Sequence, residues 1–247
     1  IYSIYDNLKK KFGQNFLIDK NILVKITNLI SNEKLSILEI GPGDGNLTKK
    51  IISKKPAKLD LVEIDKDLIG NLENNFSKFN YIKIHNVDIL NKNINSKYDL
   101  VISNLPYNIS SQIIVKLSSI KNRPTKLILM FQKEFALRLL DKKINSINSL
   151  IKCFYDIKLN FHVSRNCFRP IPKVDSSVLT FDIKKSLIKK NELNKFIEFK
   201  RKLFSHKRKT LKNLLRGFRL DGQFDLSLRV EDIDLPELIA IFRATNS

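Results

Sequence analysis

The sequence contains few of the residues on which several classes of protein depend. In 247 residues it has no tryptophan and only two cysteines, Cys153 and Cys167. Two cysteines cannot build a disulfide framework or a Cys-rich zinc module, so we expect a reducing compartment. No apolar run approaches the roughly 20 residues that cross a bilayer, and no charged-then-apolar leader follows Ile1. We therefore expect a cytoplasmic protein with no membrane partner.

Common metal and nucleophile motifs are also missing. The histidines, His85, His162 and His206, are scattered, with no partner at metal-ligand spacing. There is no G-x-S-x-G, no H-E-x-x-H and no Walker sequence. The sequence therefore predicts no bound metal.

Acidic residues are scarce relative to basic ones. The chain has 45 Lys+Arg against 25 Asp+Glu, a formal charge of +20, while 43% of its residues are hydrophobic. That hydrophobic fraction is enough for a folded core and argues against disorder. The positive charge makes a polyanion the first candidate partner, because surface Lys and Arg displace counterions from phosphates.

The basic residues gather in one late segment. An AT-rich genome would raise the lysine content without function, but such drift would spread the charge evenly. Residues 200–219 instead hold nine basic residues and no acid, which favours a nucleic-acid surface. An amphipathic lipid-binding face is the lesser alternative, formed by Leu203, Leu211, Leu214, Leu215 and Phe218. The nine basic residues are Lys200, Arg201, Lys202, Lys207, Arg208, Lys209, Lys212, Arg216 and Arg219.

Short apolar runs rich in β-branched residues alternate with stretches of helical period, as in an α/β domain with a mostly parallel sheet. The last two predicted strands have no clear helix between them, so we expect a doubly wound sheet that ends in a hairpin. Strands are predicted at 35–40, 59–64, 81–87, 99–103, 126–131, 157–163 and 178–183. Helices are predicted at 47–53, 68–79, 113–120 and 134–140.

After about Lys184 the β-branched runs stop and the sequence becomes helical and charged. Pro236 is well placed in a first helical turn. We therefore predict an α/β domain at 1–184 and a small all-helical, RNA-binding domain at 185–247. In the second domain, helices are predicted at 187–203, 207–216 and 236–242, and a turn at 226–230.

A glycine-rich turn directly follows the first predicted strand. Residues 39–45 are Glu-Ile-Gly-Pro-Gly-Asp-Gly, and the glycines let the backbone turn sharply and let a ligand approach closely. The spacing differs from the G-x-G-x-x-G that suits a pyrophosphate. The acid Glu39, beside Gly41 and Gly43, suits a cation such as an amino-acid ammonium. The pattern points toward S-adenosylmethionine, with an ordinary glycine turn as the alternative.

Two further acids follow the next two strands. Glu63 ends the second strand beside Ile64, 22 residues beyond Gly41, where a carboxylate can accept both hydroxyls of a ribose. Asp65 more simply caps the following helix. Asp88 follows the third strand and can accept a hydrogen bond from the adenine amine of a cofactor, or it is an ordinary turn residue. Such groups after successive parallel strands line one crevice.

The strongest signal, Asn104-Leu105-Pro106-Tyr107, follows the fourth strand. The Asn104 side-chain oxygen and the Leu105 carbonyl can accept both N–H bonds of an adenine amine and leave its lone pair aimed at a methyl donor. Pro106 fixes the turn, and Tyr107 can stack on the base. The alternative is an Asn-Pro-type turn with a buried tyrosine.

An N-terminal segment, Lys-Phe-Gly-Gln-Asn-Phe-Leu at 11–17, precedes the first predicted strand. As a lid over the cofactor it would place Gln14, Asn15 and Leu17 near the methionine end. The alternative is a simple N-terminal arm.

A loop with two prolines at 168–176 comes late in the predicted sheet. It could present Phe168 to the face of the target base opposite Tyr107, because bases taken out of a helix are held by stacking. An equal alternative is that Phe168 is a core residue held by the rigid prolines.

Together these residues resemble the ribosomal RNA adenine N6-dimethyltransferase family over about Lys11 to Phe242. The resemblance implies a Rossmann-like class I methyltransferase fold that uses S-adenosylmethionine, with a seven-stranded sheet and a helical C-terminal domain. It rests on F-G-Q-N-F-L (12–17), E-I-G-P-G-D-G-N-L-T (39–48), V-E-I-D (62–65), N-L-P-Y-N-I-S (104–110), Q-K-E (132–134) and F-R-P-I-P-K-V-D-S-S-V-L (168–179). The family's cofactor contacts then fall on Asn15, Leu17, Gly41, Glu63, Asp88 and Asn104.

Two details resemble the branch of the family that acts on the small ribosomal subunit. In Val-Asp-Ser at 174–176 the middle residue is Asp, where enzymes of the Erm branch tend to have Asn. Segments 204–213 and 226–231 are similar to the corresponding segments of the small-subunit branch. The resemblance implies dimethylation of two adjacent adenosines in a small-subunit rRNA loop. The partner would be that rRNA or the assembling 30S particle, and the enzyme a monomer. The alternatives are an Erm-type enzyme, a non-catalytic assembly factor on the same fold, and a nicotinamide dehydrogenase.

Overall fold

The computed structural model describes residues 14–94, 97–218, 220 and 222–245. The chain divides into two compact units. The first contains the chain up to Ala136 and the segment Ile157–Ile183, and the second contains Leu137–Asp156 and the chain from Lys184 onward. The second unit therefore includes a segment that precedes the last two long strands in the sequence.

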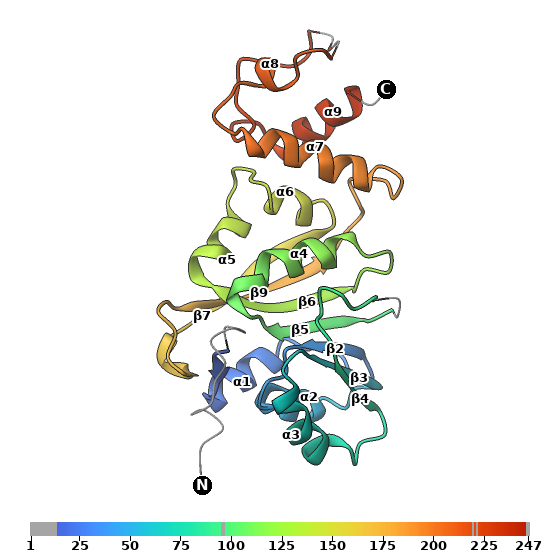
Figure 1. Cartoon of the computed structure of the whole chain (residues 1–247), viewed down its shortest axis with the longest axis vertical. Coiled ribbons are helices and arrows are strands. Elements are labelled where there is room, and N and C mark those ends of the chain that lie inside the picture. The colour runs from blue at the N-terminus through green and yellow to red at the C-terminus, as the bar shows by residue number, and fades with distance from the viewer. Residues whose placement is uncertain (1–13, 95–96, 219, 221, 246–247) are drawn as a thin grey trace. The chain divides into compact units, whose positions relative to one another are not determined.

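A seven-stranded sheet forms the centre of the first unit (Figure 1). Its order is β4-β3-β2-β5-β6-β9-β7; the pairs from β4 to β6 are parallel, and β9 is antiparallel to β6. This confirms the predicted, mostly parallel sheet. The strands are β2 (Ser36–Ile40), β3 (Lys58–Glu63), β4 (Ile82–Asn86), β5 (Leu100–Asn104), β6 (Lys126–Gln132), β7 (Tyr155–Val163) and β9 (Ser176–Ile183).

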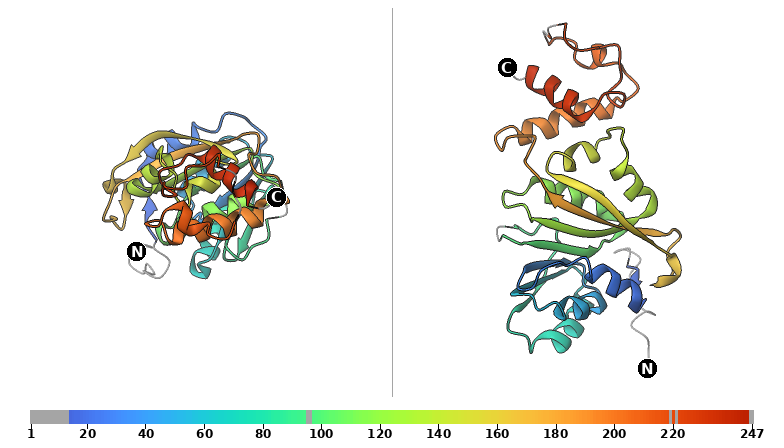
Figure 2. Two further views of the ribbon diagram at one scale, coloured as in Figure 1. Left: turned by 90° about the horizontal axis from the view of Figure 1, so that it is seen from above. Right: turned by 180° about the vertical axis from the view of Figure 1, so that it is seen from behind.

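Helices cover both faces of this sheet. Leu59 and Leu61 of β3 share one buried cluster with Leu72 and Phe76 of α3, which covers one face. The buried apolar residues of α4, Ile113, Ile114 and Leu117, lie outside that cluster, and α4 lies in front of the sheet in Figure 1, whereas Figure 2 shows the molecule from behind. The helices are α1 (Lys20–Thr27), α2 (Asn46–Ile52), α3 (Lys66–Phe76), α4 (Ser110–Ser119) and α5 (Lys133–Leu140), which runs into the second unit.

A small second sheet lies outside the seven strands. The short strands β1 (Phe16–Leu17) and β8 (Phe168–Arg169) pair antiparallel, and the amide of Ile18 donates to the carbonyl of Cys167 at 2.9 Å. The sequence analysis missed both strands, because two-residue strands carry no periodic signal, and it also missed α1. The N-terminal segment is thus bound to the loop that links β7 to β9.

The second unit is helical, but two of its helices are shorter than predicted. The predicted helix at 207–216 is reduced to α8 (Leu211–Leu214), because the amides of Leu211 and Lys212 donate to the carbonyls of Leu228 and Leu226. The predicted helix at 187–203 begins only at Leu193. The remaining helices are α6 (Asn148–Ile151), α7 (Leu193–Ser205) and α9 (Leu235–Ala244).

The core of the second unit is aromatic. The rings of Phe196 and Phe242 meet edge to face, with their centroids 5.2 Å apart, and Phe199 also packs on Phe242. Asp234 caps α9 by accepting from the amide of Glu237. No helix among the described residues has the length and apolar character needed to cross a membrane.

Candidate functional site

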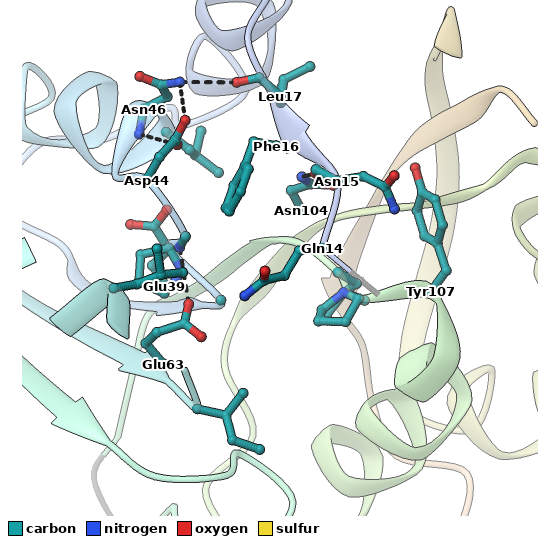
Figure 3. A pocket seen from close by; sticks show the side chains of 18 of the residues that line it. Gln14, Asn15, Phe16, Leu17, Glu39, Asp44, Asn46, Glu63, Asn104 and Tyr107 are labelled. Carbon is teal, nitrogen blue, oxygen red and sulfur yellow. Dashed lines mark hydrogen bonds between the residues drawn. The ribbon is translucent and has the colours of Figure 1, made fainter. Parts of the chain in front are cut away.

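A pocket opens at the carboxyl ends of β2, β3 and β5 (Figure 3). In open α/β sheets this edge is where ligands bind. Residues from six segments line it: Gln14–Leu17, Leu23, Glu39 with the glycine turn and the start of α2, Glu63 and Ile64, Leu68, and Asn104–Tyr107. The structure therefore brings together most of the residues predicted to hold a cofactor and a target base.

The glycine turn has left-handed backbone at Gly41, Gly43 and Gly45, with φ of +65°, +59° and +77°. A Cβ on Gly43 would lie 2.6 Å from the ring of Phe16, and one on Gly45 would lie 2.7 Å from the ring of Phe76. At these two positions the protein's own aromatic rings, as well as the backbone angles, require glycine. Phe16, which the sequence analysis did not single out, therefore forms a wall of the pocket.

Glu39 lies at the base of the pocket and is 1% exposed. Its Oε2 accepts a hydrogen bond from the Thr48 hydroxyl at 2.7 Å, whereas its Oε1 is buried without a partner. Burial raises the pKa of this carboxyl to about 8, with smaller contributions from the nearby Asp44 and Glu63. A buried acceptor without a donor costs free energy, so Glu39 is ready to receive a cationic N–H donor.

Glu63, which lines the same pocket, is held by backbone amides. Its two oxygens accept from the amides of Gly43 at 3.1 Å and Asp65 at 2.9 Å. Burial nevertheless raises the pKa of the Glu63 carboxyl. Asp65 caps α3, as predicted, and also accepts from the side chain of Gln14 at 2.6 Å. This contact fixes the N-terminal segment beside the pocket.

The charge of the pocket is opposite to that of the chain. Three acids, Glu39, Asp44 and Glu63, line it, and no Lys, Arg or His is found among the described lining residues, although the chain carries +20 overall. An acidic lining of this kind disfavours an anion such as a pyrophosphate, and a bound cation favours the ionised form of its carboxyls. The pocket therefore favours a ligand with a positive charge.

The turn after β5 forms the opposite side of the pocket. The side-chain nitrogen of Asn104 donates to the carbonyl of Asn15 at 2.9 Å, which leaves the Oδ1 end of the amide to accept from a ligand. Pro106 and Tyr107 line the pocket, and Leu105 is buried. The hydroxyl of Tyr107 is hydrogen-bonded to the hydroxyl of Ser176 at 2.6 Å. Burial raises the pKa of the Tyr107 hydroxyl.

Two predicted site residues are not among those that line the pocket. Phe168 is fully buried in the hydrophobic core with Leu17 and Val163, so its ring is not presented for stacking on a base. This placement matches the alternative of a core residue. Asp88 does not line the pocket; its Oδ1 accepts from the amide of Leu90 at 2.8 Å, as expected for a turn residue.

The basic segment is exposed, with one exception. Lys200 is only 4% exposed, because it lies on the inner face of α7 with Phe196 and Leu203 and its ammonium donates to the carbonyl of Ser146. Burial lowers the pKa of Lys200 to about 8. Its placement argues against direct RNA contact. The other described members are exposed: Arg201, Lys202, Lys207, Arg208, Lys209, Lys212 and Arg216.

The alternative of a lipid-binding face is wrong. Leu203, Leu211, Leu214 and Leu215 are all buried inside the protein, and only Phe218 is exposed, at 44%. The predicted contributions of Lys11, Phe12, Gly13 and Arg219 lie outside the described residues. Among the residues that are described, no group of His, Cys, Asp and Glu is arranged to hold a metal ion.

The fold and the site define a class. Counted within the main sheet alone, the strand order is 3-2-1-4-5-7-6, with an antiparallel seventh strand and a ligand pocket at the carboxyl ends. Solved methyltransferases share this architecture: the chain superposes with a TM-score of 0.74 on the 23S rRNA methyltransferase ErmE, at 20% identity over 94% of this chain and all of the other. The protein therefore has the Rossmann-like fold of the methyltransferases.

The sequence comparisons identify the family. The model of the ribosomal RNA adenine dimethylase family matches residues 5–240, and the chain belongs to this family. It is 40% identical to the ribosomal RNA small subunit methyltransferase A of Mycoplasma mycoides, over 95% of this chain and 96% of that one. The enzyme of the same name from a Hydrogenobaculum species is 36% identical, over 95% of this chain and 92% of that one. The solved structure of a dimethyladenosine transferase from Plasmodium falciparum superposes with a TM-score of 0.78 at 26% identity, over 94% of this chain and 98% of that one.

Proposed function

We propose that the protein uses S-adenosylmethionine to dimethylate N6 of two adjacent adenosines in a small-subunit rRNA loop during assembly of that subunit. The observation that carries the proposal is one pocket with an acidic side for a cationic cofactor and the Asn104–Tyr107 turn for an adenine amine. The family and the names of the relatives support the substrate.

The acidic side fits S-adenosylmethionine. When bound, this cofactor supplies an activated methyl group and carries two positive charges, an ammonium and a sulfonium. The partnerless Oε1 of Glu39 is the acceptor for the ammonium. Glu63, already held by the amides of Gly43 and Asp65, has lone pairs left for the ribose hydroxyls, and Ile64, 42% exposed, offers apolar surface to the adenine.

The other side of the pocket positions the adenine amine that is to be methylated. The Asn104 amide is oriented by Asn15, so its Oδ1 accepts one N–H, and the Leu105 carbonyl accepts the other. Two acceptors hold the nitrogen with its lone pair directed at the methyl group, and the proton leaves after methylation. The contribution is one of orientation rather than of a strong base. Tyr107 provides the stacking surface.

The C-terminal unit supplies affinity for RNA. Its exposed basic residues, Arg201 and Lys202 on α7 and Lys207–Lys209 beyond it, are suited to backbone phosphates. Phosphate contacts position RNA without reading its sequence, so we assign the choice of base to the pocket.

The test is Asn104→Ala with undermethylated small subunits as substrate and labelled cofactor as methyl donor. We expect methyl transfer to fall by roughly 100-fold or more, while small-subunit binding stays within about threefold because Asn104 contributes little to RNA affinity. Asn75→Ala, on the exposed face of α3, is the matched control and keeps full activity.

Nucleoside mass spectrometry separates the outcomes. Dimethyladenosine in small-subunit RNA that depends on Asn104 supports the proposal. Label on large-subunit RNA instead would indicate an Erm-type enzyme. Cofactor binding without label on either subunit would indicate a non-catalytic assembly factor.

A further inference from the structure

The loop at 170–175 exposes apolar side chains beside the pocket. Ile171 is 53% exposed and Val174 is 38% exposed, whereas Pro172 between them is buried. Ile171 is the most exposed of the large hydrophobic side chains among the described residues. An apolar side chain that is held out into solvent from a buried anchor calls for an explanation.

Both ends of this loop are attached to walls of the pocket. Before it, Phe168 of β8 pairs with Leu17 of β1, and Leu17 lines the pocket. After it, the hydroxyl of Ser176 bonds to the hydroxyl of Tyr107 at 2.6 Å. The two ends of the loop are therefore tied to pocket residues, one of which, Tyr107, is the residue we assign to the target base.

The body of the loop is also held in place. The carboxylate of Asp175 accepts from the amide of Arg165 at 2.9 Å, and the carbonyl of Asp175 accepts from the amide of Lys133 at 2.9 Å. The Arg165 guanidinium donates to the carbonyl of Lys173 at 3.4 Å. These bonds, together with the buried Pro172, fix the position from which Ile171 projects.

Basic residues flank Ile171 along the chain. Arg165, Arg169 and Lys173 are exposed, and Asp175 is the acid among them, already bonded to a backbone amide. An exposed apolar side chain within a basic frame suits a nucleic acid, whose bases are apolar and whose backbone is anionic.

We propose that Ile171 is a wedge that enters the base stack of the RNA and fills the space left by the adenosine that moves into the pocket. The inference rests on the proposed function, because methylation of N6 in the pocket requires the adenosine to leave its stack. Leu and Ile side chains inserted between bases are a known means of holding a nucleic acid in an unstacked form. The Ile171 side chain stabilises the RNA conformation in which the adenosine has left its stack, and it does not touch the reacting atoms. Ile171 is therefore a positioning residue.

The test compares Ile171→Ser, Ile171→Leu and, as a matched control, Ile183→Ser. Ile183 is 44% exposed at the far end of β9. We expect Ile171→Ser to lower the single-turnover rate on saturating undermethylated small subunits by about tenfold or more, since an apolar contact with the bases is lost. Ile171→Leu keeps the rate within about twofold, and Ile183→Ser leaves it unchanged. Small-subunit affinity, cofactor affinity and melting temperature stay near those of the wild type in all three.

The outcomes for the wedge and for the proposed function are distinct. A rate for Ile171→Ser within about twofold of the wild type, or an equal loss in Ile171→Leu, overturns the wedge and leaves the proposed function intact. A loss that appears only as weaker small-subunit affinity assigns Ile171 to general RNA binding and also overturns the wedge. A wild-type protein that transfers no methyl to adenosine removes the proposed function and the wedge with it.

Discussion

The binding of the cofactor should release a proton from Glu39. In the unliganded protein this buried carboxyl has a pKa of about 8, so it is mostly protonated at neutral pH. An ammonium placed on its partnerless Oε1 favours the carboxylate, and the proton must leave. Glu39 therefore makes cofactor affinity depend on pH, although the cofactor's own charges do not change between pH 6 and pH 7.

The magnitude follows from the fraction of Glu39 that is ionised. With a pKa of about 8, the ionised fraction of Glu39 falls from about 9% at pH 7 to about 1% at pH 6, so the apparent affinity should fall by about ninefold over that pH unit. Isothermal titration calorimetry in two buffers of different ionisation enthalpy measures the number of protons released. We expect it to approach one per cofactor at pH 6.5.

Glu39→Gln is the control variant. It should bind the cofactor more weakly at pH 8, and its affinity should change by less than about threefold over the same pH range. A raised pKa means that Glu39 stabilises the unliganded fold below its unfolded pKa and that this contribution is lost as the pH rises through about 8. As the pH rises, the melting temperature of the variant should therefore increase relative to that of the wild type. Equal pH dependence of binding in both proteins, or no proton release, would refute the reasoning.

Two further substitutions test the packing around the site and the RNA surface. Gly43→Ala places a Cβ 2.6 Å from the Phe16 ring at a φ of +59°, so urea unfolding should show a loss of about 1–3 kcal/mol. Phe16→Leu in the same chain should recover part of it, and strictly additive losses would contradict the contact. Lys200→Met should leave both RNA affinity and its salt dependence unchanged, because Lys200 is buried, whereas Arg201→Met should weaken binding and reduce the salt slope by about one. A reduced slope in Lys200→Met would place that ammonium on the RNA.

The sequence predicts the central sheet well because parallel strands buried on both faces produce continuous apolar runs. Each of the seven predicted strands lies within about two residues of an observed one. The short pair β1 and β8 could not be predicted, since its existence depends on contacts between residues 16 and 169. The same holds for the bond between Tyr107 and Ser176, which lie 69 residues apart.

The errors in the site have separate physical causes. Counting charge along 200–219 treats every lysine alike, yet Leu193, Phe196, Lys200 and Leu203 share one face of α7 and are buried together. Helical spacing would have marked Lys200 as an inner residue. For Phe168 the two interpretations were chemically equal, and only the packing of β8 on β1 separates them. The spacing of the glycines predicts the turn, but it does not predict that the rings of Phe16 and Phe76 exclude any other residue at Gly43 and Gly45.

The pairing of β1 with β8 also sets an order of events during synthesis. Phe16 and Leu17 form one wall of the pocket, but their partner strand is made about 150 residues later. A nascent chain that has emerged only as far as β6 already contains Glu39, Glu63 and Asn104, and the bonds from Asp65 and Asn104 to the N-terminal segment can form, but the strand that pairs with β1 is still missing. Newly made protein should therefore gain its full affinity for the cofactor after residue 169 has left the ribosome, when nearly the whole first unit has been translated.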